Sequence, residues 1–191
     1  MSGAPRKPMM IDEFLTWEDQ QEFRWEFDGF VPVAMTGGTL GYSTIQRNLI
    51  TALTLRLRGG RCRPHGPDVK IEVAGSIRYP DALVICSPQS DRATLAADPV
   101  VVFEIVSPST SRTDRFVKAR EYGDTASIQR YVILEQTSQS ATVFTRMNGT
   151  WASIVLDGDA TLAMPEIDSS IPLSELYLDL GLPRDDAEGQ G

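Results

Sequence analysis

The spacing of hydrophobic and polar positions changes along the chain, and each change predicts a new secondary-structure element. A short helix is expected over residues 11 to 17, and the run FRWEFDGFVPVAM then alternates around Asp28-Gly29 as a β-hairpin does. From residue 44 to residue 57 the apolar positions recur at helical spacing, and two glycines follow soon after. The first third of the chain therefore predicts a helix, a hairpin and a longer helix.

The rest of the chain alternates between strand-like and helical patterns. A second longer helix is expected from near Thr113 to Gly123, and the segment IPLSELYLDLGL predicts a short helix or turn. Strand-like runs bounded by turn-forming residues lie at 68–73, 81–86 and 99–106, and in RYVILEQ, SATVFTRM and WASIVL. We expect one mixed α/β domain over residues 8–180, with a central mixed sheet flanked by helices, and disordered termini at 1–7 and 184–191.

Composition places the chain among ordinary globular proteins. It has 191 residues, of which 41% are hydrophobic, and it contains neither a signal-peptide pattern nor an apolar segment as long as a membrane span. We therefore expect a cytoplasmic protein that does not enter the membrane. Its two cysteines, Cys62 and Cys86, have no metal-binding or redox spacing, so two reduced thiols are expected.

The net charge of −8 is unevenly distributed. Residues 29–156 hold fourteen basic and ten acidic side chains, so the acidic excess lies in the two ends of the chain. Two basic groups within this middle region could bind DNA phosphates, although solvated arginines on a helix end and in a loop would give the same pattern. The predicted DNA-binding residues are Arg56, Arg58, Arg61 and Arg63 in the first group, and Arg112 and Arg115 in the second.

A carboxylate in the middle of an apolar strand is the strongest chemical signal. Glu104 interrupts the run VVVFEIV, and a buried carboxylate is costly unless it is paired, binds a metal or takes up a proton. Asp81 begins the preceding apolar strand, and antiparallel pairing of the two strands would bring both acids together. The predicted helix that follows carries Asp114, Lys118 and Tyr122 four residues apart, which places them on one helical face.

Two acids and a lysine can bind a divalent cation, polarise a phosphoryl oxygen and orient a water molecule. This combination is typical of metal-assisted phosphodiester hydrolysis. Each residue alone has a simpler explanation: Asp81 as a strand-entry turn residue, Lys118 as half of a surface helix pair, and Glu104 as a buried acid satisfied by an arginine.

Several segments together resemble the Uma-type putative restriction endonucleases, a branch of the PD-(D/E)XK nuclease superfamily. They are RWEFDG (24–29), DVKI (68–71), YPDALVIC (79–86), VVVFEIVSPST (100–110), and DRFVKAREY followed by SIQRYVILEQ. The match extends from about Ile11 to about Tyr177. The resemblance implies a restriction-endonuclease-like core, in which a mixed sheet flanked by helices presents the acids at one edge.

The resemblance also implies a role for particular residues. Asp81 stands at the family's PD aspartate and Glu104 at its second acid, whereas Val106 stands where the superfamily pattern has lysine. Lys118 is the matching residue in those members whose lysine lies in the following helix. Glu26 is a candidate further acid near the site. Ser43, in the loop expected before the long helix, stands close to a position that often holds histidine.

These observations predict a metal-dependent DNA endonuclease. Mg²⁺ or Mn²⁺ would be bound by Asp81, Glu104 and the carbonyl of Ile105, and Lys118 would orient water or stabilise developing charge. Asp114 and Tyr122 would position Lys118. A homodimer is a further expectation, because superfamily relatives that cut both strands often act as dimers. Two alternatives stay open: a degenerate nuclease fold that binds nucleic acid or a protein without cleavage, and an interaction module whose acids form a buried ion network.

Overall fold

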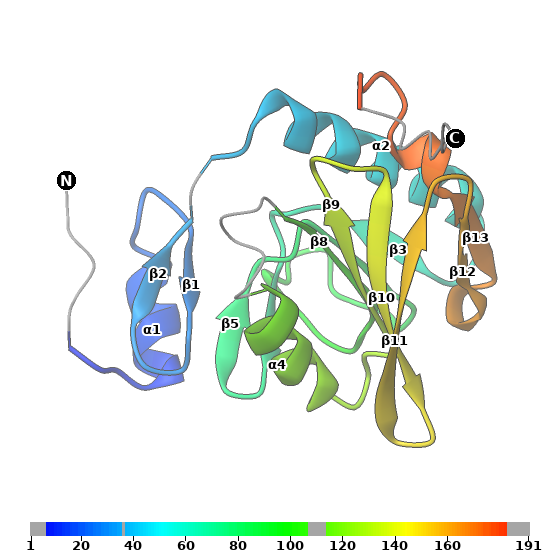
Figure 1. Ribbon diagram of the computed structural model, residues 1–191. Coiled ribbons are helices and arrows are strands. Elements are labelled where there is room, and N and C mark those ends of the chain that lie inside the picture. The colour runs from blue at the N-terminus through cyan, green and yellow to red at the C-terminus, as the bar shows by residue number, and fades with distance from the viewer. Residues whose placement is uncertain (1–6, 36, 107–113, 183–191) are drawn as a thin grey trace.

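A six-stranded mixed sheet forms the centre of the molecule (Figure 1). The computed structural model describes residues 7–35, 37–106 and 114–182, and of Asp114 and Arg115 it describes the backbone alone. Strands β8 and β9 run parallel, and every other neighbouring pair in this sheet is antiparallel. In spatial order the strands are β11 (Thr150–Asp157), β10 (Ser140–Met147), β9 (Arg130–Glu135), β8 (Pro99–Val106), β6 (Ala82–Ile85) and β3 (Arg63–His65).

A second sheet of five short strands carries the amino-terminal hairpin. The expected hairpin is present, since β1 and β2 pair antiparallel on either side of the turn at Asp28-Gly29. The spatial order is β2 (Pro32–Ala34), β1 (Trp25–Phe27), β5 (Ser76–Arg78), β4 (Lys70–Val73) and β7 (Leu95–Ala96). A separate hairpin pairs β12 (Thr161–Met164) with β13 (Ser169–Pro172).

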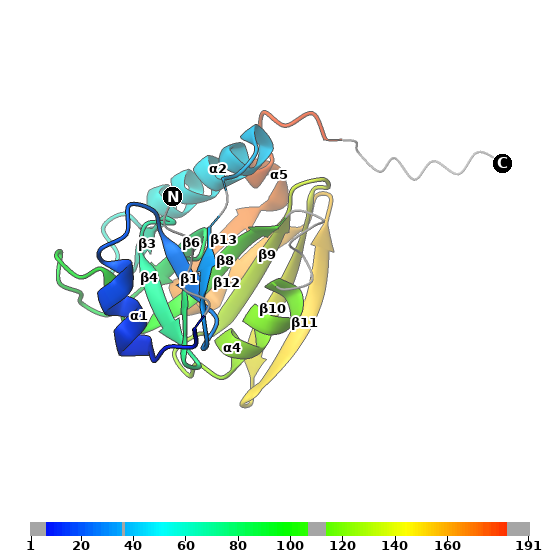
Figure 2. The ribbon, with the colours of Figure 1, turned by 90° about the vertical axis from the view of Figure 1, so that its left-hand side faces the viewer.

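Helices cover both faces of the six-stranded sheet. Figure 2 shows the long helix α2 (Leu40–Leu57) along one side and α4 (Ala119–Gly123) on the other. A π-helical turn, η1 (Asp114–Lys118), leads directly into α4. The remaining helical segments are α1 (Ile11–Glu18), the 3₁₀ turn η2 (Pro165–Ile167) and α5 (Leu173–Leu176).

Alternation along β8 divides the core between the two faces. Val101, Phe103 and Ile105 pack under α2 with Leu49 and Leu53. The intervening positions face the other way, into a second cluster that contains Val102, Val106 and the aromatic residues Tyr122 and Tyr131. Because successive strand residues point to opposite faces, Glu104 lies on the side of α4 and within this second layer.

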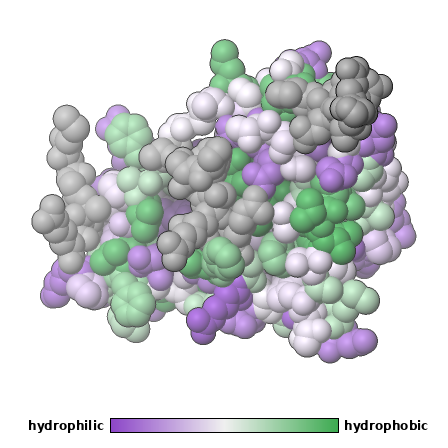
Figure 3. Space-filling view, viewed as in Figure 1, coloured by the Kyte–Doolittle hydropathy of each residue, from purple (hydrophilic) through white to green (hydrophobic). Residues whose placement is uncertain are grey.

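The described surface mixes polar and apolar side chains, with a compact apolar patch in its right-hand half in Figure 3. The edge strand β11 exposes Ile154 and Val155. None of the helices within the described ranges combines the length and the apolar character needed to cross a bilayer.

Two sequence expectations about local structure were wrong. The long helix begins at Leu40 and not at Thr44, because the Thr39 side chain caps it, so Ser43 lies in a helix instead of a loop. His65 was expected in a loop, but it lies in β3 and pairs with Leu83 of β6. The second longer helix is present and ends at Gly123 as expected, but its first turn is a π-helix, whose wider repeat weakens the four-residue spacing argument for Asp114.

The expectation of two reduced thiols was also wrong. Cys62 precedes β3 and Cys86 follows β6, and the antiparallel pairing of these strands places the two cysteines opposite each other. Their Cα atoms are 3.9 Å apart and their sulfur atoms form a disulfide. The separation of 24 residues in sequence contains no signal of this contact, which depends on the strand pairing.

Candidate active site

Asp81 and Glu104 lie opposite each other across two antiparallel strands. Ala82 of β6 pairs with Phe103 of β8, so Asp81, just before β6, lies opposite Glu104. Both side chains are buried, with 8% of Asp81 and 5% of Glu104 exposed. The predicted convergence of the two acids is therefore present in the fold.

Glu104 accepts two hydrogen bonds from the helix that follows it. Lys118 Nζ donates to Oε1 at 2.9 Å, and the Tyr122 hydroxyl donates to the same oxygen at 2.8 Å. Burial and the Glu104 carboxylate raise the pKa of Tyr122 well above its ordinary value, which keeps the phenol protonated as a donor. Tyr122, predicted to position Lys118, thus contacts the carboxylate that Lys118 binds.

Asp81 is held at both of its carboxylate oxygens. The backbone N–H of Ile105 donates to Oδ2 at 2.6 Å, and the Tyr42 hydroxyl donates to Oδ1. Gln46 Nε2 donates to the Tyr42 oxygen at 3.0 Å and to the Asp81 carbonyl at 3.3 Å. Burial and Asp81 raise the pKa of Tyr42, so this phenol is also a donor.

Sequence reasoning missed Tyr42 and Gln46. Tyr42 lies three residues before Ile45 and continues the apolar stripe of α2, so its pattern is that of a core residue. Its hydroxyl becomes informative only once the pairing of β6 with β8 is known.

Glu26 joins the site from the hairpin in the second sheet. Its Oε1 lies 3.4 Å from Lys118 Nζ and accepts the Tyr79 N–H at 3.2 Å. Its Oε2 accepts from Arg78 Nη1 at 3.2 Å. The structure thus places Glu26, the candidate further acid, beside Lys118, and 13% of the Glu26 side chain is exposed.

Arg78 and Glu121 extend this network and were not predicted. The Arg78 guanidinium binds both oxygens of Glu121, at 2.7 and 2.6 Å, while the Ser76 hydroxyl donates to Glu121 at 2.9 Å. Burial opposes the charge on Arg78, but the carboxylates of Glu121 and Glu26 outweigh it and raise the arginine's pKa. A buried chain of alternating charges therefore runs from α4 through Arg78 and Glu26 to Lys118.

The donor set suits a hard divalent cation. Asp81 and Glu104 supply carboxylate oxygens on adjacent strands, each of which can accept further contacts beyond its hydrogen bonds. Across 7–35, 37–106 and 114–182, no three His, Cys, Asp or Glu side chains converge as a complete metal cage. Two carboxylates completed by backbone, water and substrate phosphate oxygens are a typical Mg²⁺ environment, so these residues fit the expected ion.

One of the predicted DNA-binding arginines, Arg56, lies away from the two acids. Arg56 lies fourteen residues beyond Tyr42 on α2, about 21 Å along the helix axis. Its guanidinium binds Glu175 at 2.8 and 2.6 Å and the Ser170 carbonyl at 2.7 Å. The hydrogen bond to Glu175 is the largest influence on the pKa of Arg56 and raises it, although burial acts in the opposite direction.

The structure describes the side chains of only some of the other predicted DNA-binding arginines. Arg58, Arg61 and Arg63 are exposed near the end of α2, although Arg63 also donates to the Cys62 carbonyl at 3.0 Å. Arg112 lies outside the described residues, as do the side chains of Arg115 and Asp114. The predicted roles of these residues stay predictions.

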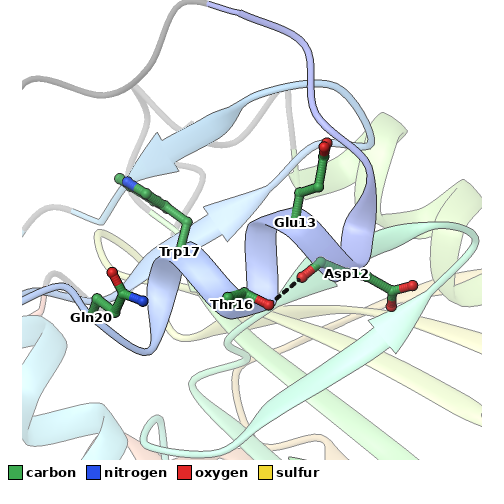
Figure 4. A pocket seen from close by; sticks show the side chains of 5 residues that line it. All are labelled: Asp12, Glu13, Thr16, Trp17 and Gln20. Carbon is green, nitrogen blue, oxygen red and sulfur yellow. Dashed lines mark hydrogen bonds between the residues drawn. The ribbon is translucent and has the colours of Figure 1, made fainter.

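A shallow depression elsewhere is lined by α1 and the turn after it. Figure 4 shows the side chains of Asp12, Glu13, Thr16 and Trp17 from the helix and of Gln20 from the turn, with the Thr16 hydroxyl donating to the Asp12 carbonyl at 2.9 Å. The lining includes neither Asp81 nor Glu104, so the depression is separate from the candidate active site.

The mixed sheet flanked by helices is a restriction-endonuclease-like fold. A crystal structure from Anabaena variabilis, described as a putative nuclease belonging to DUF820, has the same fold. It matches with a TM-score of 0.71 and 19% sequence identity, over 89% of this chain and 98% of that one.

The family follows from sequence. The Uma2 profile, described as a putative restriction endonuclease, matches residues 11–174, and the chain belongs to this family. It is also 31% identical over 180 residues to "Uncharacterized protein slr1290" of Synechocystis sp., covering 92% of this chain and 94% of that protein. The resemblance found in the sequence is confirmed.

Proposed function

We propose that this protein is a metal-dependent endonuclease that hydrolyses phosphodiester bonds of DNA. The observation that carries the proposal is the placement of Asp81 directly across the strand pair from Glu104, whose Oε1 accepts from Lys118 at 2.9 Å. Two carboxylates beside one ammonium group provide both a cation site and a positive charge next to it. Membership of the Uma2 family supports a nuclease activity.

The residues around the pair divide the work of binding and positioning. Asp81 and Glu104, with the Ile105 carbonyl, would bind Mg²⁺ or Mn²⁺. When bound, the ion would neutralise phosphate charge and make a water molecule more acidic. Tyr122 fixes the Glu104 carboxylate through its hydroxyl, and Ile105 N–H fixes Asp81.

Lys118 supplies the positive charge of the site. Its ammonium group lies 2.9 Å from a carboxylate oxygen of Glu104 and 3.4 Å from one of Glu26. The Lys118 side chain is 9% exposed. In the proposed reaction it donates to an attacking water or to a phosphate oxygen on which charge develops. Glu26, itself held by Arg78 and the Tyr79 N–H, keeps the ammonium group in place.

Metal binding can be tested without knowing the DNA sequence. Mn²⁺ is titrated calorimetrically into the purified protein and into Glu104→Gln. The matched control is Glu175→Gln, the same chemical change at a carboxylate on α5. Glu175 pairs with Arg56 in the last turn of α2, whereas Tyr42, which contacts Asp81, lies in the first turn. We expect binding to the parent and the control and loss of binding in Glu104→Gln. Equal binding by both variants would contradict a site at Glu104.

Cleavage is then measured on supercoiled plasmid in Mg²⁺ or Mn²⁺, with EDTA as the negative control. We expect nicked or linear product from the parent and a loss of at least tenfold in Lys118→Ala. DNA affinity should fall steeply with salt, because phosphate contacts release counterions. Two copies of the chain would act together in cutting both strands, and sedimentation in the presence of DNA measures that assembly.

A second function, DNA binding without cleavage, is favoured by one observation. Val106 is buried in the position where the superfamily pattern has lysine, and Lys118 is already paired with carboxylates. If DNA is bound but plasmid stays intact in every metal tested, with identical results for Lys118→Ala, this second function replaces the first.

A further inference from the structure

The first turn of α2 is built to hold one tyrosine ring in place. The Thr39 side chain caps the helix by accepting the Tyr42 N–H at 3.1 Å, and its hydroxyl donates to Gln136 Oε1 at 3.0 Å, beyond the end of β9. Gly38 lies against the ring: a Cβ there would come within 2.4 Å of a Tyr42 ring carbon. Any side chain at residue 38 would therefore displace the ring.

The phenol end of Tyr42 is held as closely as its backbone. Its hydroxyl donates to Asp81 Oδ1, and its oxygen accepts from Gln46 Nε2 at 3.0 Å, one helical turn later. Gln46 also donates to the Asp81 carbonyl at 3.3 Å. Tyr42 and Gln46 therefore bind both the side chain and the backbone of Asp81, the residue that precedes β6.

We infer that Tyr42, supported by Gln46, is a positioning residue that orients the Asp81 carboxylate toward a divalent cation. The inference rests on the proposed function, since it concerns the same ion. It goes further by assigning a role to the amino-terminal turn of α2, on the opposite face of the sheet from Lys118 and Tyr122.

The geometry gives the physical reason. An aspartate side chain has rotatable bonds at Cα–Cβ and Cβ–Cγ, so its carboxylate can present its lone pairs in many directions, and two donors on separate oxygens limit that rotation. Ile105 N–H holds Oδ2 at 2.6 Å, and the Tyr42 hydroxyl donates to Oδ1. Loss of the phenol removes one of these constraints, so more of the ordering of the carboxylate would have to accompany each metal-binding event, which weakens binding.

The test compares Tyr42→Phe with Tyr177→Phe. Each variant removes one hydroxyl from a tyrosine that packs in or against the core, but the Tyr177 hydroxyl donates to the backbone carbonyls of Glu135 and Ser140, whereas the Tyr42 hydroxyl donates to a carboxylate. Mn²⁺ affinity is measured by calorimetry, and thermal unfolding is measured in EDTA. We expect Tyr42→Phe to bind Mn²⁺ about 10- to 100-fold more weakly, and Tyr177→Phe to bind like the parent.

Gln46→Leu provides a second variant in which the phenol remains. It should weaken Mn²⁺ binding in the same direction as Tyr42→Phe and by a smaller factor, because Asp81 keeps its direct donor. This variant also decides the matter if Tyr42→Phe does not fold. If Tyr42 had a merely structural role, Tyr42→Phe would lose Mn²⁺ affinity only to the extent that it loses thermal stability. Tyr177→Phe shows how much affinity is lost through destabilisation alone.

The outcomes separate this inference from the proposed function. If the parent binds Mn²⁺ and both Tyr42→Phe and Gln46→Leu bind as tightly or more tightly, the positioning role is overturned while the metal site stands. If the parent binds no Mn²⁺, the metal site and the positioning role fall together.

Discussion

Arg78 offers the sharpest test of the buried charge network. We consider Arg78→Met, which keeps an unbranched chain of similar length and removes the guanidinium group. The arginine is 3% exposed, and its three contacts join two carboxylates from different elements: Glu121 on α4 at 2.7 and 2.6 Å, and Glu26 on β1 at 3.2 Å. The substitution leaves both acids, 12% and 13% exposed at their side chains, without this cation.

The expected cost follows from burial and distance. Opposite charges about 4 Å apart attract by roughly 4 kcal/mol at an effective dielectric constant of about 20, and desolvation of the arginine offsets part of that sum. Removing one partner of a buried ion pair typically costs about 3–5 kcal/mol. For a chain of this length each kcal/mol lowers the melting temperature by about 2–4 °C, so a loss of roughly 6–20 °C is expected.

Thermal unfolding followed by circular dichroism at pH 7.5 measures this loss. The double variant Arg78→Met with Glu121→Gln should lose less than the sum of the two single variants, because it removes both members of the closest pair. A melting temperature within about 2 °C of the parent, or strict additivity in the double variant, would show that the network contributes little to folding.

Three further predictions concern other parts of the molecule. Gly123→Ala should destabilise the fold by about 1–3 kcal/mol in urea unfolding, since its Cβ would lie 2.2 Å from Trp151 Nε1. Burial lowers the pKa of His65, so its ring should titrate below about 6.5 in the NMR spectrum, and its contribution to stability, complete above that pH, should be lost as the pH falls toward its folded pKa. Arg56→Ala should cost about 1 kcal/mol through its pair with Glu175 and leave the salt dependence of DNA binding unchanged.

Each of these has a direct control or a contradicting result. Gly66→Ala adds a Cβ with no atom within 4 Å and should be nearly neutral, unlike Gly123→Ala. A His65 midpoint at or above 6.5 would contradict the effect of burial. Arg61→Ala, at an exposed position, should reduce DNA affinity and its salt slope; a larger effect from Arg56→Ala would mean that its pair with Glu175 opens on binding.

The sequence predicted those site residues whose environment is local. Glu104 was found because a single acid interrupts an apolar strand, and Asp81 because it begins the preceding one. The register of β6 against β8 then brought them together as expected. Lys118 needed the family resemblance as well, because nothing in its local pattern distinguishes it from a surface helix residue.

Contacts between residues far apart in the sequence were not predicted. Arg78 and Glu26 are 52 positions apart, and Arg56 and Glu175 are 119 apart. Charge clustering along the chain suggested that Arg56 faces DNA, and it gave no signal of the pair with Glu175 through which the guanidinium ties α2 to α5. Tyr42 fits an apolar stripe so well that its hydroxyl carries no separate signal in the sequence.

The Cys62–Cys86 disulfide makes a closed covalent ring of the segment between them. Lys70, Arg78, Tyr79 and Asp81 all belong to this ring. A protease that cuts once inside it would leave both pieces attached, so the nicked chain would migrate as a single band until a reductant separated the fragments. The part of the chain that delivers Asp81 to the site is thus tethered at both ends, independently of the contacts that fold it.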